Sequence, residues 1–352
     1  MSRRFPLVRC VAAAGILSLA VAAGPGAAAG SSPGRGGDDV TLRLGYFPNV
    51  THASALVGVE GGLFEESLGD DVTLQTATFN AGPAAVEALF SGAIDATYIG
   101  PNPAINAFAQ SDGEAIRIVS GATSGGAFLV VNPDMERPRD LEGKTIASPQ
   151  LGNTQDVALR TWLEDKGFEA DTTGGGDVSV VPQDNAQTLE LFRSGDIDGA
   201  WVPEPWATRL IDEGDGEILV DERDLWPKGR YVTTHLIVAT EFLEENPEVV
   251  KQLLEGQVAA TGLIEEDPDE AQDLVAQGIE NATGTAIPPE LVAATFETLT
   301  FTNDPIASSL RRSAKNAEAV GLLEPVDLDG IYSLKLLNQV LEADGQPKVK
   351  GR

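Results

Sequence analysis

Two stretches about a hundred residues apart carry nearly the same sequence pattern. The first runs from Leu89 to Pro101 and the second from Leu191 to Pro203, with one residue inserted in the second copy. Each predicts a helix end, a Ser-Gly stop, an Ile-Asp pair and a short apolar strand that ends near a proline. Each also follows a β-rich segment and an Asn-Ala pair. A helix with a glycine stop before a buried strand is a common α/β connection, but the shared order of features favours two similar α/β lobes.

The N-terminal segment has the features of an export signal. Three arginines precede an apolar run from Val11 to Ala23, which is too short to span a membrane, and Ala27-Ala28-Ala29 offers a cleavage site. We expect a signal peptide over residues 1–29 and a flexible Gly/Ser-rich leader over residues 30–39. The single cysteine, Cys10, precedes the apolar run, so no lipid anchor is expected. Pro6 favours the general secretion route over the twin-arginine route, and the mature chain is predicted to be secreted and periplasmic or extracytoplasmic.

Charge and composition exclude several classes of function. The chain has 24 Lys and Arg against 54 Asp and Glu, a net charge of -30, and loss of Arg3, Arg4 and Arg9 makes it -33. Nucleic acid and anionic membranes are therefore poor partners. The mature chain has no cysteine, which excludes disulfides, thiolate nucleophiles and thiolate-bound zinc. With only His52 and His235 as histidines, we expect no metal and no cofactor.

Strands alternate with helices along most of the chain, which predicts two mainly parallel α/β sheets. The 352 residues suit two domains of ordinary size. Helices that begin at Asn246-Pro247, Asp267-Pro268 and Pro288-Pro289 should return to the first lobe. We expect crossings near Val131-Asn132 and near residues 230–232, which give lobe one residues 40–131 and 232–352 and lobe two residues 132–231. Two crossing strands form a hinge that permits closure around a ligand.

The predicted strands are Thr41–Tyr46, Val72–Thr78, Ala96–Ile99, Ile116–Ser120, Phe128–Val131, Lys144–Ala147, Val178–Val181, Gly199–Val202, Ile218–Asp221 and Tyr231–Ala239.

Neutral polar residues follow many of the predicted strands. Ligands of open α/β sheets lie beyond the carboxyl ends of the strands, where uncapped helix N-termini attract anions. Hydroxyls, amides and main-chain N–H groups at these ends would suit an oxyanion. The predicted ligand-binding residues are Asn49, Thr51, His52, Asn80, Gly82, Asn102, Ser124, Asn153, Thr154, Trp201 and Glu204. Thr123, Gln155 and Asn185 lie at the same strand ends.

Each of these residues also has an ordinary structural interpretation. Thr51, Asn102, Asn153 and Thr154 are good helix caps in any α/β domain. Trp201 corresponds to Tyr98 in the repeat, and an aromatic at a strand end is as often core as ligand platform. A carboxylate in an anion site is unfavourable unless it meets a cation or a hydrogen-bond donor. Glu204 therefore either binds an amino group on a zwitterionic ligand or faces solvent.

Four motifs carry a resemblance to a known family, and they span nearly all of the mature chain. The chain resembles the periplasmic solute-binding proteins of ABC importers, in the group for nitrate, taurine, aliphatic sulfonates and bicarbonate. It is most similar to the aliphatic sulfonate branch, except that Glu204 stands where that branch more often has Asp. The motifs are Gly45-Tyr-Phe-Pro-Asn-Val-Thr-His52, Tyr98-Ile-Gly-Pro-Asn-Pro-Ala104, Pro149-Gln-Leu-Gly-Asn-Thr-Gln155 and Trp201-Val-Pro-Glu-Pro-Trp206.

The resemblance implies the two-lobed periplasmic-binding-protein fold of type II, with a sulfonate or similar anion held by helix N-termini. It also implies a monomer that delivers its ligand to a membrane permease, with a place in sulfur metabolism and no catalytic activity. An enzyme on the same fold is the main rival class, and the missing cysteine argues against it. Within the binding class the alternative is a carrier of a thiamine precursor or flavin, stacked on Tyr98, Trp201 or Trp206.

Overall fold

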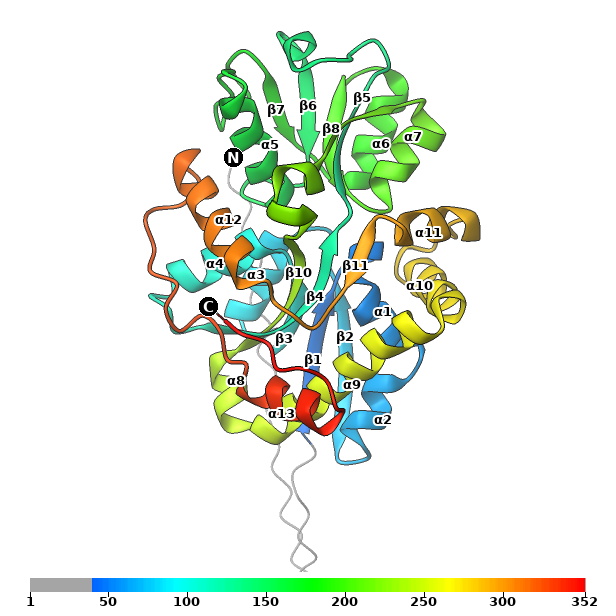
Figure 1. Ribbon diagram of the computed structural model, residues 1–352, viewed down its shortest axis with the longest axis vertical. Coiled ribbons are helices and arrows are strands. Elements are labelled where there is room, and N and C mark those ends of the chain that lie inside the picture. Colours follow the sequence, from blue (N-terminus) through cyan, green and yellow to red (C-terminus); the bar gives the residue numbers. More distant parts are fainter. Residues whose placement is uncertain (1–39, 352) are drawn as a thin grey trace, which may run out of the picture. The chain divides into compact units, whose positions relative to one another are not determined.

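The computed structural model describes residues 40–351, so the predicted signal peptide and leader lie outside the described residues. Within this range the chain alternates strands and helices and then becomes mainly helical (Figure 1). No helix in residues 40–351 has the length and apolar character needed to cross a membrane. The strands are β1 (Val40–Tyr46), β2 (Val72–Thr78), β3 (Ala96–Ile99), β4 (Ile116–Gly125), β5 (Ala127–Val131), β6 (Thr145–Ser148), β7 (Ser179–Pro182), β8 (Gly199–Pro203), β9 (Glu217–Asp221), β10 (Val232–Ala239) and β11 (Leu299–Phe301).

The helices agree with the predicted starts at Pro247, Pro268 and Pro289. Proline suits the first turn because the N–H it lacks has no partner within the helix there. The helices are α1 (Ala53–Glu60), α2 (Leu63–Leu68), α3 (Gly82–Phe90), α4 (Pro101–Gln110), α5 (Thr154–Asp165), α6 (Asn185–Ser194), α7 (Trp206–Gly214), α8 (Thr240–Glu245), α9 (Pro247–Glu266), α10 (Pro268–Thr283), α11 (Pro289–Phe296), α12 (Ala307–Ala319) and α13 (Lys335–Ala343), with short 3-10 turns η1 (Val50–His52), η2 (Pro138–Leu141), η3 (Glu222–Leu225) and η4 (Pro227–Gly229).

The strands of residues 40–351 form two sheets with the same inner order. One has six strands in the order β11-β4-β10-β3-β1-β2, and the other has five in the order β7-β6-β8-β5-β9. In both, three neighbouring strands are parallel, β2-β1-β3 in the first and β7-β6-β8 in the second. The remaining strands pair antiparallel, so the expectation of mainly parallel sheets holds only for these inner triplets. We call each sheet with its helices the first and the second lobe.

The aspartate of the repeated Ile-Asp pair makes the same two hydrogen bonds in both lobes. In the first lobe the Asp95 carboxylate accepts a hydrogen bond from the backbone N–H of Arg43 on β1 at 2.8 Å, and the Asp95 N–H donates to the Arg43 carbonyl. In the second lobe the Asp198 carboxylate accepts from the N–H of Thr145 on β6 at 2.9 Å, and the Asp198 N–H donates to the Thr145 carbonyl. The matching bonds support the duplication that the sequence pattern indicated.

One predicted boundary is wrong. The predicted strand Phe128–Val131 was expected in lobe one, but the corresponding strand β5 pairs with β8 and β9 in the second sheet. The chain leaves the first sheet between β4 and β5, at Gly125 and Gly126, whose φ angles of 86° and 70° suit glycine. A Cβ on Gly126 would also lie 2.2 Å from Leu299. The second crossing, just before β10, agrees with the prediction.

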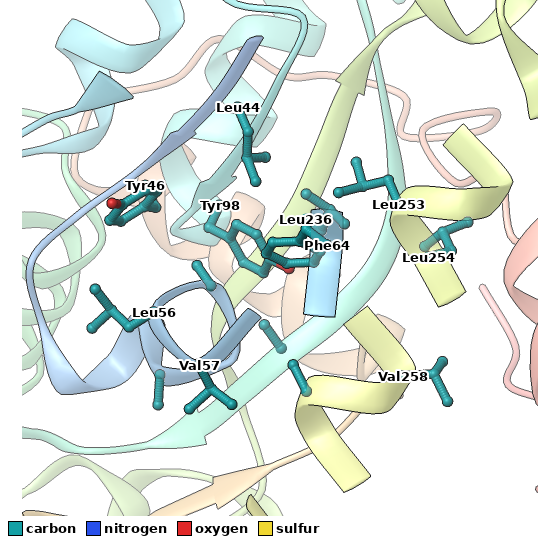
Figure 2. Close-up of a cluster of buried hydrophobic side chains, with 14 of the residues drawn as sticks. Leu44, Tyr46, Leu56, Val57, Phe64, Tyr98, Leu236, Leu253, Leu254 and Val258 are labelled. Carbon is teal, nitrogen blue, oxygen red and sulfur yellow. The ribbon is translucent and has the colours of Figure 1, made fainter. Parts of the chain in front are cut away.

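Each sheet is covered by helices on both faces. In the first lobe one face packs on α1, α2, α9, α10 and α13, and the other packs on α3, α4 and α12. Figure 2 shows the first of these cores, where Tyr98 and Leu44 from the sheet lie beside Phe64 of α2 and Leu253 of α9. In the second lobe α5 covers one face, and α6 and α7 cover the other. The C-terminal helices thus return to the first lobe, as predicted.

Candidate functional site

A small polar cavity lies where the two sheets turn their strand ends toward each other. Its volume is about 20 Å³, which is room for a group of about the size of one or two water molecules. Residues from both lobes line it. We call it the inner cavity, and its lining residues are Phe47, Asn49, Thr51, His52, Asn80, Gly100, Pro149, Asn153, Thr154, Gln155, Asn185, Pro203, Thr233 and Thr234.

The repeat contributes equivalent positions to this cavity. Asn80 and Asn185 follow the second strand of each parallel triplet, and both line it. Gly100 directly follows β3 and Pro203 is the last residue of β8, the two copies of the repeated apolar strand, and both residues line the cavity too. The third contribution comes from the segment after each first strand, with Asn49 to His52 in one lobe and residues 149–155 in the other. The duplication has therefore built one site from paired loops.

The inner cavity is rich in polar groups and free of charged ones. Among the described residues that line it, none is Lys, Arg, Asp or Glu. The hydroxyl oxygens of Thr154 and Thr234 and the amide oxygen of Asn185 are buried there without a hydrogen-bond partner. Buried polar atoms are rarely left unpaired, and each costs about 1–3 kcal/mol. These three atoms are therefore positioned to meet a polar ligand.

Helices α3, α4, α5 and α6 begin at residues that line the cavity or lie within two residues of one that does. Helices α3, α4 and α6 start with no side chain accepting a hydrogen bond at the N-cap. Helix α5 differs, because the Asn153 side chain accepts from the Thr154 N–H at 2.5 Å. Helix N-termini carry a partial positive charge and unpaired donors, so this arrangement favours an anion without any cationic side chain.

A buried ion pair holds the loop that carries Asn153 and Thr154. The Asp156 carboxylate accepts hydrogen bonds from the Ser148 hydroxyl at 2.7 Å, the Gly152 N–H at 2.9 Å and the Arg160 Nε at 3.1 Å. The Asp156 and Arg160 side chains are 0 and 1 % exposed. Because these bonds fix both ends of the loop between β6 and α5, the Thr154 hydroxyl is held in place before any ligand arrives.

His52 lines the inner cavity with an uncharged side chain. Its Nδ1 accepts a hydrogen bond from the Phe47 N–H at 3.3 Å, and its ring stacks on the Phe47 ring with centroids 4.4 Å apart. Burial lowers the pKa of His52 to about 3. At neutral pH the ring is therefore uncharged, its free nitrogen carries the proton, and it is a very weak base.

Two contacts join the lobes beside the cavity. The Trp206 indole N–H on α7 donates to the Asn49 amide oxygen at 2.9 Å. Gly100, at the start of α4, lies so close to α5 that a Cβ on it would come within 2.3 Å of the Thr154 hydroxyl oxygen. A glycine is needed at position 100 for the lobes to approach this closely.

The structure brings six of the eleven predicted site residues together at this cavity. They are Asn49, Thr51, His52, Asn80, Asn153 and Thr154. The second histidine, His235, does not line the inner cavity: it is fully buried on β10 with its Nε2 3.0 Å from the Pro305 carbonyl oxygen.

Two of the remaining five, Trp201 and Glu204, are held by other partners. Trp201 lies in the second-lobe core and donates its indole N–H to the Glu222 carboxylate at 2.9 Å. Its repeat counterpart Tyr98 is equally buried and donates to Gln257, so the aromatic pair belongs to the cores. Glu204 neither faces solvent nor lines the inner cavity: it is 2 % exposed and accepts from the Thr208 N–H and hydroxyl in the first turn of α7. Burial raises its pKa to about 7.

The other three lie outside the inner cavity for reasons of packing. Asn102 turns its amide onto the Ser313 carbonyl of α12 at 3.3 Å. Ser124 lies within β4 between β10 and β11. Gly82 permits the close approach of α3 and α4, since a Cβ there would lie 2.2 Å from Pro103.

Eight lining residues were not predicted as ligand-binding. The repeat itself was the signal for Gly100, Pro203 and Asn185, because they lie at or just beyond the ends of matching strands. Thr233 and Thr234 come from the returning strand β10, and no local pattern marks them. The remaining three are Phe47, Pro149 and Gln155. Within residues 40–351 we find no group of three or more His, Cys, Asp or Glu side chains able to hold a metal ion.

Comparison with known proteins agrees with this architecture. The taurine-binding periplasmic protein of Escherichia coli (strain K12) is 28 % identical over 197 residues, which are 56 % of this chain and 59 % of that protein. Two solved structures show the same fold. The zinc-bound ligand-binding component of an ABC-type import system from Staphylococcus aureus has a TM-score of 0.72 at 16 % identity and covers 86 % of this chain and 99 % of that one. The alkanesulfonate-binding protein SsuA from Xanthomonas axonopodis pv. citri, bound to MOPS, has a TM-score of 0.66 at 22 % identity and covers 82 % and 96 %.

These likenesses confirm the resemblance found in the sequence motifs, and the two-lobed fold is that of periplasmic binding proteins. The family assignment comes from the sequence: residues 35–280, well over half of the chain, match the family described as NMT1-like. The chain belongs to the NMT1-like family.

Proposed function

We propose that this chain is the solute-binding protein of an ABC-type importer and that it captures a small organic anion, an aliphatic sulfonate, outside the cytoplasm. The family and its taurine-binding and alkanesulfonate-binding relatives support the transport role. The observation that carries the ligand class is the inner cavity, where unpaired buried hydroxyls and helix N-termini converge without any charged side chain. A permanent oxyanion such as a sulfonate matches this set of neutral donors.

The same cavity supports binding rather than catalysis. An enzyme of the hydrolytic or acid–base kind needs a base with a pKa near the working pH. Among the described lining residues the titratable side chain is His52, and burial lowers its pKa to about 3. We therefore propose a monomeric carrier that closes on its ligand and passes it to a membrane permease, with no nucleic acid partner.

A carrier of a thiamine precursor or flavin is less well supported. Such a ligand would need exposed aromatic faces in the site. Of the three candidate aromatics, Tyr98 and Trp201 are fully buried in the cores, and only Trp206 is half-buried near the inner cavity.

A thermal-shift panel on the mature protein tests the assignment. A ligand at about a hundred times its Kd should stabilise the folded state by roughly 2.7 kcal/mol. We expect alkanesulfonates to raise the melting temperature. If riboflavin or thiamine precursors raise it while sulfonates, taurine, nitrate and bicarbonate do not, the sulfonate assignment is wrong.

A further inference from the structure

A larger groove adjoins the inner cavity and shares Asn49, Asn80 and Asn185 with it. The groove has a volume of about 480 Å³, within the range of small-molecule sites. We call it the outer groove. Three parts of the chain line it: the strand ends of the first lobe (Pro48, Asn49, Thr78, Phe79 and Asn80), helices α6 and α7 of the second (Asp184, Asn185, Ala186, Leu189, Glu190, Pro205, Trp206 and Arg209), and the end of α10 with the segment that follows it (Ile279, Ala282, Thr283, Thr285 and Ile287).

The outer groove differs from the inner cavity in having apolar walls. Phe79, Leu189, Trp206, Ile279 and Ile287 surround it from both lobes. Figure 1 shows where α10 and α11 lie relative to α7, the helix that carries Trp206. When a ligand places a compact polar group in the inner cavity, the apolar outer groove lies next to that group.

The Trp206 ring is fixed in place as one wall of the groove. Its N–H is held by Asn49 of the other lobe at 2.9 Å, and the Arg209 guanidinium lies over the ring at 4.9 Å from its centroid. Arg209 is itself held by Glu213 at 2.6 Å. A ring restrained at its edge and on one face loses little conformational freedom when an apolar group packs beside it.

A second space also adjoins the inner cavity and is the competing route for a ligand. It has a volume of about 560 Å³ and shares Asn80 and Pro149 with the inner cavity. Thr78, Phe79, Asn80 and Asp184 line both spaces, and the other walls of the second space are polar or small, with Gln150 and Gln183 among them. Apolar groups therefore gain more by entering the outer groove.

We propose that the ligand has two parts: an anionic head in the inner cavity and an apolar alkyl or aryl tail in the outer groove, with Trp206 and Ile279 as specificity-determining residues. This inference rests on the proposed function for the head group. It adds that the protein discriminates among anions by their tails, and that compact ions such as nitrate or bicarbonate bind more weakly than longer-tailed anions.

The test compares ethanesulfonate with hexane-1-sulfonate by titration calorimetry. Each methylene buried adds about fourfold to affinity. Allowing for a partly open groove, hexane-1-sulfonate should bind at least about tenfold more tightly than ethanesulfonate. Equal affinities for the two ligands would overturn the proposal.

Two matched tryptophan variants locate the tail. Ala186 is exposed and lines the outer groove, whereas Ala84 is exposed and lines the competing space. Ala186→Trp should remove the preference for the longer sulfonate and leave ethanesulfonate affinity within about twofold, while Ala84→Trp should leave the preference intact. The reverse result would place the tail in the competing space and overturn the assignment. Circular dichroism melting curves check that both variants fold.

A third variant tests the aromatic wall. Trp206→Ala should lower the affinity for hexane-1-sulfonate about tenfold more than that for ethanesulfonate, because a loss at the Asn49 contact alone would weaken both ligands equally. An equal loss for both ligands would remove Trp206 from tail recognition. If neither sulfonate binds the folded protein, the head-group assignment fails, and the comparison is repeated with acetate and hexanoate. A preference for hexanoate that Ala186→Trp removes keeps the tail site, whereas no preference overturns it.

Discussion

Gly100 of the first lobe and Thr154 of the second are in such close contact that any β-carbon at position 100 would overlap the Thr154 hydroxyl, at 2.3 Å. Gly100 has extended backbone angles, φ -69° and ψ 161°, which alanine adopts without strain. Gly100→Ala should therefore leave the melting temperature of the ligand-free protein nearly unchanged and weaken ligand binding about tenfold or more, because the lobes cannot close fully. Titration calorimetry measures this, with Gly262→Ala on α9, where a Cβ meets nothing within 4 Å, as the control. Unchanged affinity in Gly100→Ala would show that this contact is not needed for binding.

The unpaired Thr154 hydroxyl should contribute to affinity and not to stability. Thr154→Val keeps the shape and removes a buried oxygen that has no partner. A hydrogen bond to a charged ligand is worth about 1.5–3 kcal/mol, so we expect at least a tenfold weaker Kd with an equal or higher melting temperature. Thr161 is the matched control, since its hydroxyl on the same helix is also unpaired but does not line the inner cavity. If Thr154→Val and Thr161→Val behave alike, Thr154 is only part of the helix start.

Ligand affinity should be flat between pH 5 and pH 8. His52 lines the inner cavity, but burial lowers its pKa to about 3, so its charge does not change in this range. Kd values for ethanesulfonate, whose head group stays ionised, should agree within about twofold across the range. Stronger binding that develops as the pH falls through 6.5 would mean that a protonated His52 holds the anion.

Glu204 should make the folded state less stable as the pH rises. Burial raises its pKa from 4.5 to about 7, so between these values the folded state binds more protons than the unfolded state. Its contribution to stability is present below about pH 4.5 and falls as the pH rises toward 7. Glu204→Gln can keep both bonds to Thr208, so its stability relative to the wild type should increase by about 2–3 kcal/mol from pH 5 to pH 8.

Urea unfolding at the two pH values measures this difference. The exposed Glu280 on α10 provides the control, since Glu280→Gln should give the same small effect at both pH values. A Glu204→Gln effect that does not depend on pH would show that the Glu204 carboxyl titrates normally.

The Asp156–Arg160 pair should be essential for the loop at the inner cavity. Asp156→Ala leaves the Arg160 charge buried, which typically costs about 3–5 kcal/mol, and it frees the Ser148 and Gly152 donors. The partly exposed pair of Arg137 and Asp140 should matter by about 1 kcal/mol or less when Asp140→Ala is made. Chemical unfolding compares the two variants. A loss below about 1 kcal/mol in Asp156→Ala would show that the pair is not structurally important.

Local patterns predicted the elements closely. The bounds Val72–Thr78 and Ala96–Ile99 agree with β2 and β3, and the prolines at 247, 268 and 289 begin the predicted helices. These features depend on neighbouring residues, through strand periodicity and through the N–H that proline lacks. The crossing at Gly125-Gly126 was missed although the glycine pair marked it, because an apolar strand such as β5 can join either sheet.

The site was predicted only in part. The sequence placed polar residues at strand ends, and six of the eleven line the inner cavity. Trp201 and Glu204 were predicted to face the ligand because they end a strand, yet Glu222 and Thr208 hold them elsewhere. Glu222 lies 21 residues further along the chain, which no local spacing rule covers, and Thr208 meets Glu204 at a spacing of four because α7 begins between them.

By itself, the sequence determined that the chain contains two related α/β lobes, because the strand, Ile-Asp and Ser-Gly features recur in the same order, and hydrophobic periodicity and turn residues are set by neighbouring positions. Only the tertiary structure decided how these repeats differ in use. It placed Tyr98 and Trp201 in the cores and their neighbours Gly100 and Pro203 at the inner cavity. It also added Thr233 and Thr234 from a strand that returns more than a hundred residues after β3. These placements depend on long-range packing. The way in which the sheets and helices bury their apolar faces together determines which polar side chains come into contact.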